Sequence, residues 1–132
     1  MDTNGGTTIT FFNGGNDIDT SSGTGFRATG GGTVNVTGSG NSITSAGGPA
    51  LNVANTVIGV ANLNFQSISA NGGLNGIVLN ATGSNGLTVV GTDGGDAGTD
   101  ADAGTGGTIQ NTTGDGISLT LANNVSLGGV NI

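Results

Sequence analysis

Four aspartates stand close together in a glycine-rich stretch, and their type and spacing suit metal binding. They lie in "GTDGGDAGTDADAGTGG" and are Asp93, Asp96, Asp100 and Asp102. Calcium takes roughly six to eight oxygen ligands from carboxylates and backbone carbonyls, and glycines let those carbonyls turn toward an ion. The spacing matches neither an EF-hand loop nor the glycine-rich nonapeptide repeat that binds calcium. We therefore treat the stretch as a candidate calcium site, with a loop packed on a protein wall and a plain hydrated bulge as alternatives.

A second carboxylate pair is formed by Asp17 and Asp19, which flank Ile18. In an extended strand both would face the same side, and glycoside hydrolases use paired carboxylates. Such hydrolysis needs one carboxyl kept protonated, but the chain has no His, Glu, Trp or Tyr to build the surroundings that raise a pKa. Ser/His/Asp and Cys/His chemistry is excluded because His and Cys are absent. We therefore predict a solvated strand edge here and no enzymatic activity.

The balance of charge excludes two large classes of partner. The net charge is −7, and the single basic side chain is Arg27. Nucleic acids and anionic lipids both bind through several lysines or arginines, so neither is an expected partner. No apolar run approaches the roughly 18 residues of a membrane span, so membrane insertion is not expected. The absence of cysteine excludes disulfides and leaves the redox compartment open.

The aliphatic residues keep a fixed spacing, which a disordered glycine-rich linker would not do. The intervals from Ile18 to Ile43 and from Ile43 to Ile68 are both 25 residues. The next interval, to Ile109, is 41 residues. Removing about 15 residues from the acidic stretch at 92–106 restores the period. An internal repeat of this length predicts a solenoid that carries one inserted loop.

Within each repeat, aliphatic residues alternate with polar ones over short distances. The alternating pairs are Val34/Val36, Leu51/Val53, Ile77/Leu79, Leu87/Val89, Ile117/Leu119 and Val125/Leu127. This alternation predicts β-strands with one buried face. Glycine at this density disfavours helix, since each costs about 0.5–1 kcal/mol in a helix interior. We predict three short strands per repeat, separated by turns of Gly, Asn, Ser and Thr.

A coil of parallel strands explains the period better than a sandwich of hairpins. The two-residue Asn-Gly turns that favour hairpins are not regularly placed. In a coil, residues one repeat apart lie about 4.8 Å from one another. Two internal columns follow, one of Ile18, Ile43, Ile68 and Ile109, the other of Phe26, Leu51, Ile77 and Ile117. A repeated corner is predicted where positive φ or a close approach excludes a side chain, at Gly23, Gly48, Gly73 and Gly114.

The repeat pattern, as in "GTIQNTTGDGISLTLANNVSLGGVNI", resembles the right-handed parallel β-helix, or pectin-lyase-like, repeats of large secreted and surface-exposed bacterial proteins. Adhesins and autotransporter passengers are among them. The resemblance covers the chain from about Thr7 to Ile132. It implies an all-β, right-handed solenoid of about five rungs of roughly 25 residues. Residues 1–132 would form a single domain or a fragment of a longer solenoid, with the loop inserted at about 92–106.

Enzymes that share this fold cleave acidic polysaccharides, typically with an Arg or Lys as the base and calcium held by aspartates. Arg27 is then the sole candidate base. It follows Phe26 in a strand pattern, so we expect it to point outward into solvent. A polysaccharide-active enzyme is therefore only a remote alternative.

The predicted outer face offers few other sites. Thr33, Asn35 and Thr37 suggest one local outward row of the kind used in ice binding, but neighbouring repeats do not continue it. Phe12 is the one ring expected to be exposed, and a single ring does not make a sugar platform. Four asparagines stand in N-x-[ST] sequences, and we expect them to satisfy backbone groups at corners and ladders: Asn35, Asn80, Asn111 and Asn124.

These observations predict a non-enzymatic structural module of an extracellular or cell-surface protein, acting as a spacer or stalk. No capping helix is apparent, so the same module could equally be a subunit that stacks end to end into a fibre. In such a fibre the rung at Ile132 would pair with the rung around Ile9 of the next copy. The alternative is an adhesin-type module that binds glycan or protein through its outer wall. No cofactor is required, and Ca²⁺ is the one candidate.

Overall fold

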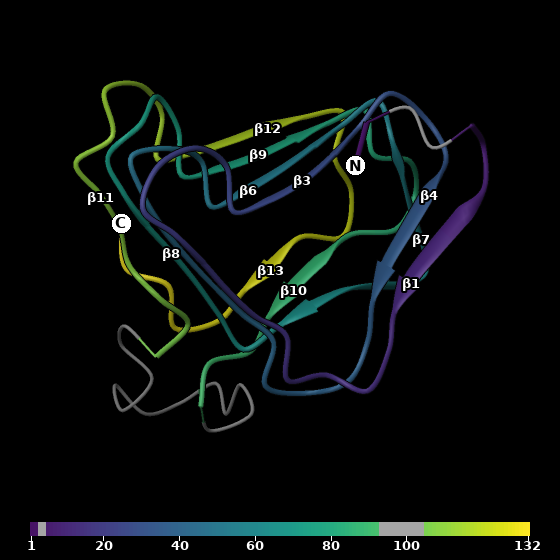
Figure 1. The fold of residues 1–132 in the computed structure, drawn as a ribbon, viewed down its shortest axis with the longest axis horizontal. Helices are drawn as coiled ribbons and strands as arrows, with labels where there is room; N and C mark the ends of the chain where they lie inside the picture. The colour runs from purple at the N-terminus through teal and green to yellow at the C-terminus, as the bar shows by residue number, and fades with distance from the viewer. Residues whose placement is uncertain (3–4, 93–104) are drawn as a thin grey trace.

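The computed structural model describes residues 1–2, 5–92 and 105–132, and every regular element in these ranges is a β-strand. The strands form three parallel sheets, which make the three sides of a triangular coil (Figure 1). The first sheet has the order β1 (Thr8–Phe11), β4 (Thr33–Val36), β7 (Val57–Phe65), β10 (Leu87–Val89) and β13 (Ser126–Leu127). The second has the order β11 (Ile109–Gln110), β8 (Ser67–Asn71), β5 (Ser42–Ala46) and β2 (Asp17–Thr20). The third has the order β12 (Ile117–Thr120), β9 (Ile77–Asn80), β6 (Leu51–Ala54) and β3 (Phe26–Thr29).

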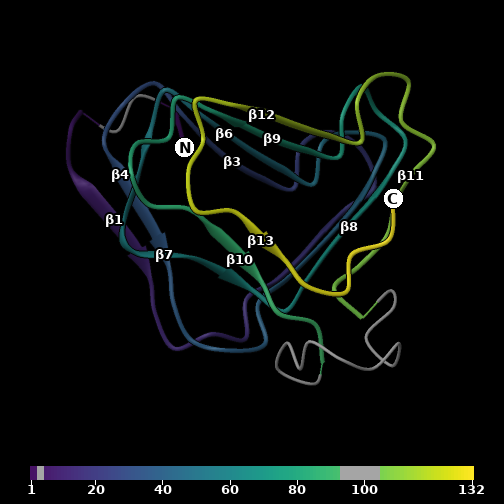
Figure 2. The same ribbon diagram turned by 180° about the vertical axis from the view of Figure 1, so that it is seen from behind.

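The coil confirms the predicted all-β solenoid with three strands per rung. Seen as in Figure 1, the chain runs clockwise as it recedes from the purple N-terminal strands, which makes the coil right-handed; Figure 2 shows the C-terminal strands from behind. The chain makes about three full circuits, fewer than the five rungs predicted. The prediction was too high because dividing the whole length by the period counts the inserted stretch, and the terminal strands β1 and β13, as full rungs.

Residues one period apart lie directly over one another. In the second sheet Ile18 pairs with Ile43, and Ile43 pairs with Ile68. In the third sheet one ladder joins Phe26, Leu51, Ile77 and Ile117. Parallel pairing in register keeps each strand's inward face aligned with that of its neighbours, so the aliphatic columns of all three sheets converge on one interior.

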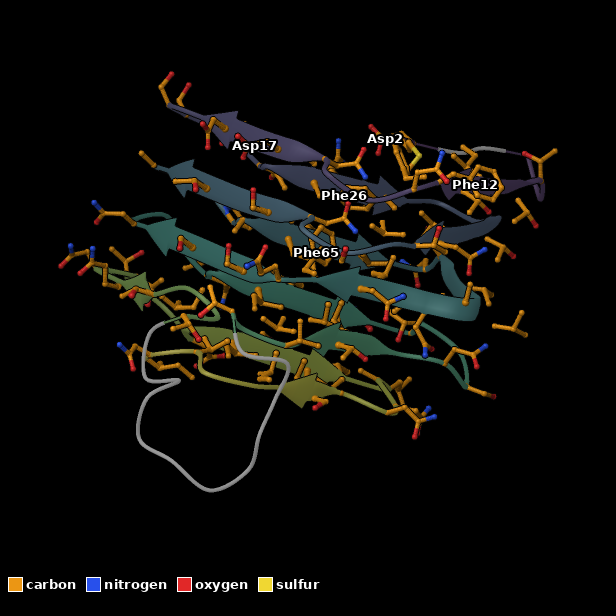
Figure 3. All side chains as sticks on the ribbon, turned by 90° about the horizontal axis from the view of Figure 1, so that it is seen from below. Asp2, Phe12, Asp17, Phe26 and Phe65 are labelled. Carbon is orange, nitrogen blue, oxygen red and sulfur yellow. The ribbon has the colours of Figure 1, made fainter. Side chains whose placement is uncertain are left out.

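That interior is filled by aliphatic side chains and an edge-to-face stack of phenylalanines. The largest fully buried side chains include Phe65, Ile43, Leu51, Ile58, Leu63, Ile68, Ile77, Leu79 and Leu87. The Phe26 ring lies between those of Phe11 and Phe65, with centroids 5.6 and 6.1 Å away. Figure 3 labels Phe26 and Phe65 of this stack. Such pairs add about 0.5–1.5 kcal/mol each to the burial of apolar area. Phe12 is 71% exposed, as predicted.

The prediction that Ile109 lies over Ile68 was wrong. Ile109 pairs with Ala70, two residues further along β8. The Ile68 N–H instead donates to the Gly106 carbonyl at 2.9 Å. A side chain on Gly107 would overlap the backbone of Ile68, so only glycine fits there. The coil thus resumes at Gly107, two residues earlier than the 41-residue interval suggested. As a result the large side chain of Ile109 lies over the small one of Ala70.

The predicted glycine corner is confirmed, and both anticipated reasons for glycine occur. Gly23 and Gly73 have positive φ values, +86° and +81°. Gly48 and Gly114 do not, but a Cβ at Gly48 would overlap the Gly23 backbone, and one at Gly114 would lie 2.8 Å from the Leu74 carbonyl oxygen. Successive rungs approach each other too closely there for any side chain.

A second corner, directly after the strands of the third sheet, is left-handed in every rung. The residues at this position have φ between +48° and +82° and are Gly30, Asn55, Ala81 and Leu121. Glycine adopts this conformation freely and Asn with little difficulty, whereas other residues pay about 1–2 kcal/mol. The corner is thus well matched in the first two rungs and strained at Ala81 and Leu121.

The row predicted at Thr33, Asn35 and Thr37 is interrupted by a bulge in β7. Val34 pairs with Ile58 and Val36 pairs with Leu63, so four residues of β7 lie opposite the single residue Asn35 of β4. Asn35 is therefore covered, not outward: it is 6% exposed and accepts a hydrogen bond from the Ala61 N–H at 3.2 Å. Its amide donates to the Thr10 hydroxyl at 3.3 Å. No continuous row of exposed polar side chains passes through this position.

We predict that Leu121→Asn raises the free energy of unfolding by about 0.5–1 kcal/mol, because Asn relieves the left-handed strain at an exposed corner. Urea denaturation followed by circular dichroism measures the change. The matched control is Leu119→Asn, at an extended position of β12 without positive φ, which should bring no gain. An unchanged or lowered stability of the Leu121 variant would contradict the strain.

The residue after this corner allows a second test. Thr82 is fully buried, and its hydroxyl has no hydrogen-bond partner among the described residues. One rung earlier, the Thr56 hydroxyl donates to the Gly31 and Ala54 carbonyls at 3.4 and 3.3 Å. We predict that Thr82→Val raises the free energy of unfolding by about 1 kcal/mol and that Thr56→Val lowers it by about 0.5–1 kcal/mol. Equal effects in urea denaturation of the two variants would contradict this difference.

Candidate functional site

The four aspartates of the candidate calcium site, Asp93, Asp96, Asp100 and Asp102, lie outside the described residues. The calcium site therefore stays a prediction. In the ranges that the structure does describe, no group of three or more His, Cys, Asp or Glu side chains comes together to hold a metal ion. The other candidate residues, Asp17, Asp19 and Arg27, lie on the outer face of the coil.

Asp17 and Asp19 lie exposed on the same side of β2, as the alternation predicted. The Ser42 hydroxyl, one rung further on, donates to Asp17 Oδ1 at 2.6 Å. Both carboxylates stand on an open, solvent-exposed strand face. This geometry lacks the enclosed surroundings that a protonated general acid needs, and it is that of a solvated strand edge.

Arg27 points outward, as expected, and its charge is matched by a carboxylate. Its Nη1 lies 2.7 Å from Asp2 Oδ2, and both side chains are about half exposed, at 51% and 52%. Asp2 also accepts a hydrogen bond from the Thr29 hydroxyl. The hydrogen bond from Thr29 is the largest influence that lowers the pKa of Asp2, while partial desolvation opposes it and the charges of Arg27 and the amino terminus lower it further. Arg27 is thus engaged with Asp2 on the first rung.

A column of amide side chains occupies the corner that leads into the second sheet. Asn41 is fully buried, and its amide donates to the backbone carbonyls of Thr37, Gly38 and Asn64 at 2.9–3.3 Å. Its Oδ1 accepts from the Asn16 amide at 2.6 Å. The amide of Asn41 thus ties three successive rungs together at one corner, as buried polar groups that are fully paired do.

Two rungs beyond Asn16, the same corner opens into a cavity of about 380 Å³. Backbone bonds continue the column, from the Gln66 N–H to Asn41 O and from the Gly91 N–H to Gln66 O. Gly91 has a φ of +75°, and a Cβ there would lie 2.5 Å from the Thr105 hydroxyl oxygen. The described residues that line the cavity are Ser39, Gly40, Gln66, Val90, Gly91 and Thr92. None of these residues is charged, so this lining suits a neutral ligand better than an ion.

Sequence reasoning missed this cavity. Its described lining residues come from three rungs and share no motif, and none of them is charged or aromatic. The signal that was available is the period itself, which aligns Asn16, Asn41, Gln66 and Gly91 at one corner. Along that column, the change from amide side chains to glycine would have indicated that this corner differs between rungs.

Two of the asparagines predicted at corners and ladders, Asn111 and Asn124, behave as expected. Asn111 and Asn124 both have positive φ. The Asn111 amide donates to Asn71 Oδ1 at 2.8 Å, and the Asn124 amide donates to the Ser84 carbonyl at 2.7 Å. Each bond joins one rung to the next, so these side chains serve the coil itself.

Comparison with protein-family models, curated proteins and solved structures finds no match to this chain. None of the described segments is a helix long and apolar enough to cross a membrane.

We predict that Thr29→Val and Arg27→Gln each raise the pKa of Asp2 toward its ordinary value of 3.8, because the Thr29 hydroxyl and the Arg27 guanidinium both lower it. NMR titration of the Asp2 carboxyl measures both. Since the folded pKa is lowered, the contribution of Asp2 to stability is present above the ordinary value and is lost as the pH falls through the lowered one. A pKa of Asp2 that neither substitution raises would contradict these contacts.

Proposed function

We propose that this chain is a structural β-solenoid segment, a spacer or stalk of an extracellular or cell-surface protein. The observation that carries the proposal is the use of the side chains: inward ones fill an aliphatic core, and many outward ones hydrogen-bond the next rung. Ser42 donates to Asp17 at 2.6 Å, and Asn111 to Asn71 at 2.8 Å. Such a solenoid gains most of its stability from contacts between neighbouring rungs, which suits a rod of adjustable length.

The extracellular or surface setting rests on the resemblance of the repeats to those of secreted bacterial β-helix proteins. An excess of acidic over basic residues and a shortage of long charged side chains accompany it. The pectin-lyase-like and adhesin or autotransporter affiliation belongs to the same proposal, and its support is the repeat pattern alone.

The pairing at the two terminal rungs allows the spacer and the fibre alike. At the N-terminal rung, Asp2 forms a parallel bridge with Thr29, so it occupies the outer edge of β3. At the C-terminal rung, Asn131 forms a parallel bridge with Thr108, just ahead of β11. Both bridges continue the coil: a second copy stacking in register would pair its Asp2 segment with β12, its β1 with β13 and its β2 with the Asn131 segment. Self-association is therefore the property that separates the spacer from the fibre.

We predict that the purified chain sediments as a monomer at high concentration and that electron microscopy shows no fibres. Asn131→Pro should increase self-association, because it removes the N–H that donates to Gly107 O at 3.0 Å and frees the β11 edge. The control is Ile132→Pro, which removes an N–H for which no described acceptor is found. Concentration-dependent fibres of the unmodified chain would overturn the spacer version and support the fibre.

A binding module is the second candidate, and the cavity at Gln66 favours it. Its described lining is uncharged and includes the Gln66 amide, which suits a glycan, and Thr92 directly precedes the acidic stretch. A glycan panel with and without Ca²⁺ tests this candidate, with Gln66→Ala to remove the cavity amide and Asp96→Asn with Asp100→Asn to weaken the predicted ion site. Retention of a glycan that needs Gln66 would favour a binder, and calcium dependence that follows the aspartates would support the ion site. No retention on any glycan leaves the spacer favoured.

A further inference from the structure

Asparagine followed by glycine is prone to an internal reaction, because no side chain shields the glycine nitrogen from the asparagine side chain. The reaction requires the glycine N–H to be free to lose its proton and the asparagine amide to be free to turn back onto it. The chain holds five such pairs, which are Asn4–Gly5, Asn13–Gly14, Asn71–Gly72, Asn75–Gly76 and Asn85–Gly86. The first includes a residue outside the described ranges, and the other four are compared here by their hydrogen bonds.

Three of these pairs are held at both groups. The Gly72 N–H donates to Gln110 O, and the Gly76 N–H donates to Gly116 O. The Gly86 N–H donates to Asn62 Oδ1, and all three distances lie between 2.8 and 3.2 Å. The asparagine side chains are also bound: Asn71 accepts from Asn111 at 2.8 Å, Asn75 donates to Asp115 O at 2.8 Å, and Asn85 donates to Ile58 O at 3.1 Å. Attack within any of these pairs first requires the rung to open locally.

Asn13–Gly14 differs from all three. Asn13 is exposed, lies in a turn with φ +71°, and its side chain makes no hydrogen bond to any described residue. The Gly14 N–H likewise has no acceptor in the described part of the chain, while its neighbour Gly15 donates to Ser39 O at 2.9 Å. Both groups of the reaction are therefore free in the folded protein.

We infer that Asn13 is a site of spontaneous covalent modification, by deamidation, in the folded protein. The Gly14 nitrogen gives up its proton to solvent and attacks Cγ of Asn13, which forms a C–N bond and a five-membered cyclic imide. The side-chain nitrogen leaves with a proton as ammonia. Water then adds to one of the two imide carbonyls and breaks its C–N bond. The products are aspartate, or isoaspartate if the chain now runs through Cβ and Cγ.

The corner has little room for isoaspartate, which adds one methylene to the main chain. A Cβ on Gly14 would overlap the Ser39 backbone, and one on Gly38 would overlap the Asn13–Gly14 peptide. The first two rungs are thus in close contact at this turn. Opening to isoaspartate should weaken the Gly15–Ser39 hydrogen bond, and both products add a negative charge to a rung that already carries Asp17 and Asp19.

The test is incubation of the folded full chain in mildly alkaline buffer, followed by peptide mapping with mass spectrometry and chromatographic separation of the aspartate and isoaspartate peptides. Asn13 should convert at least about tenfold faster than Asn71, Asn75 and Asn85, because those three react only after local opening. In urea all four should convert at similar rates. Conversion of any of the three as fast as Asn13 in the folded protein, or an Asn13 that reacts only in urea, would overturn the inference.

Two variants sharpen the comparison. Asn13→Ser should abolish conversion in its peptide and leave the others unchanged. Asn62→Gly removes the acceptor of the Gly86 N–H, and glycine tolerates the φ of +61° at this position. Because the Asn85 amide stays bound to Ile58 O in this variant, conversion of Asn85 should remain slower than that of Asn13, while Asn75 stays protected. Conversion of Asn85 as fast as that of Asn13 would show that the amide hydrogen bond does not limit the reaction, and would contradict the mechanism.

Discussion

Hydrogen bonding between successive circuits of one chain is the constraint on which the rest of this structure depends. The ladders are parallel and, over most of their length, in register at a 25-residue offset, so each residue meets its own counterpart above and below. An isoleucine must therefore fit an isoleucine, and an amide must pair with an amide. Asn16 with Asn41 and Asn71 with Asn111 are examples of side chains that repeat this pairing. The repeat in the sequence is the direct consequence of this stacking.

The same constraint decides where extra residues are tolerated. The bulge in β7 holds its additional residues away from the core, with Val60 90% exposed, and the register recovers at once where Leu63 pairs with Leu87. The interval from β9 to β12 is longer by the inserted stretch, yet all four residues of the two strands pair. Extra residues are tolerated where the ladder pairing on either side of them is kept, as it is around the β7 bulge and between β9 and β12.

The period, the strands and the two main columns could be predicted because inward aliphatic residues must repeat at the length of one circuit. The corner at Gly23 and Gly48 could be predicted for the same reason. What failed was local. Ile109 missed its expected partner because glycines such as Gly107 pack against almost any backbone, so the sequence does not mark where the coil resumes. Asn35 was expected to be outward because alternation carries no information about a bulge in the next strand. The cavity beside Gln66 depends on what the next rung lacks, which no single repeat contains.

Stacking in register also limits where chemistry can be placed on such a coil. Inward side chains are committed to the core and outward strand positions repeat at one ladder spacing, so distinct sites arise at corners, where neighbouring rungs differ. The corner of Asn16 and Asn41 is an example. In the next two rungs the same corner is occupied by Gln66 and then by Gly91, and both of these residues line the cavity. Asn13 likewise lies at a turn of the first rung where the neighbouring rung differs from those beside the other asparagines. Asn71, Asn75 and Asn85 have a neighbouring rung that binds both reactive groups, whereas no described residue binds those of Asn13–Gly14. The reactivity of a side chain in this fold is therefore set less by its own type than by whether an adjacent rung completes its hydrogen bonds.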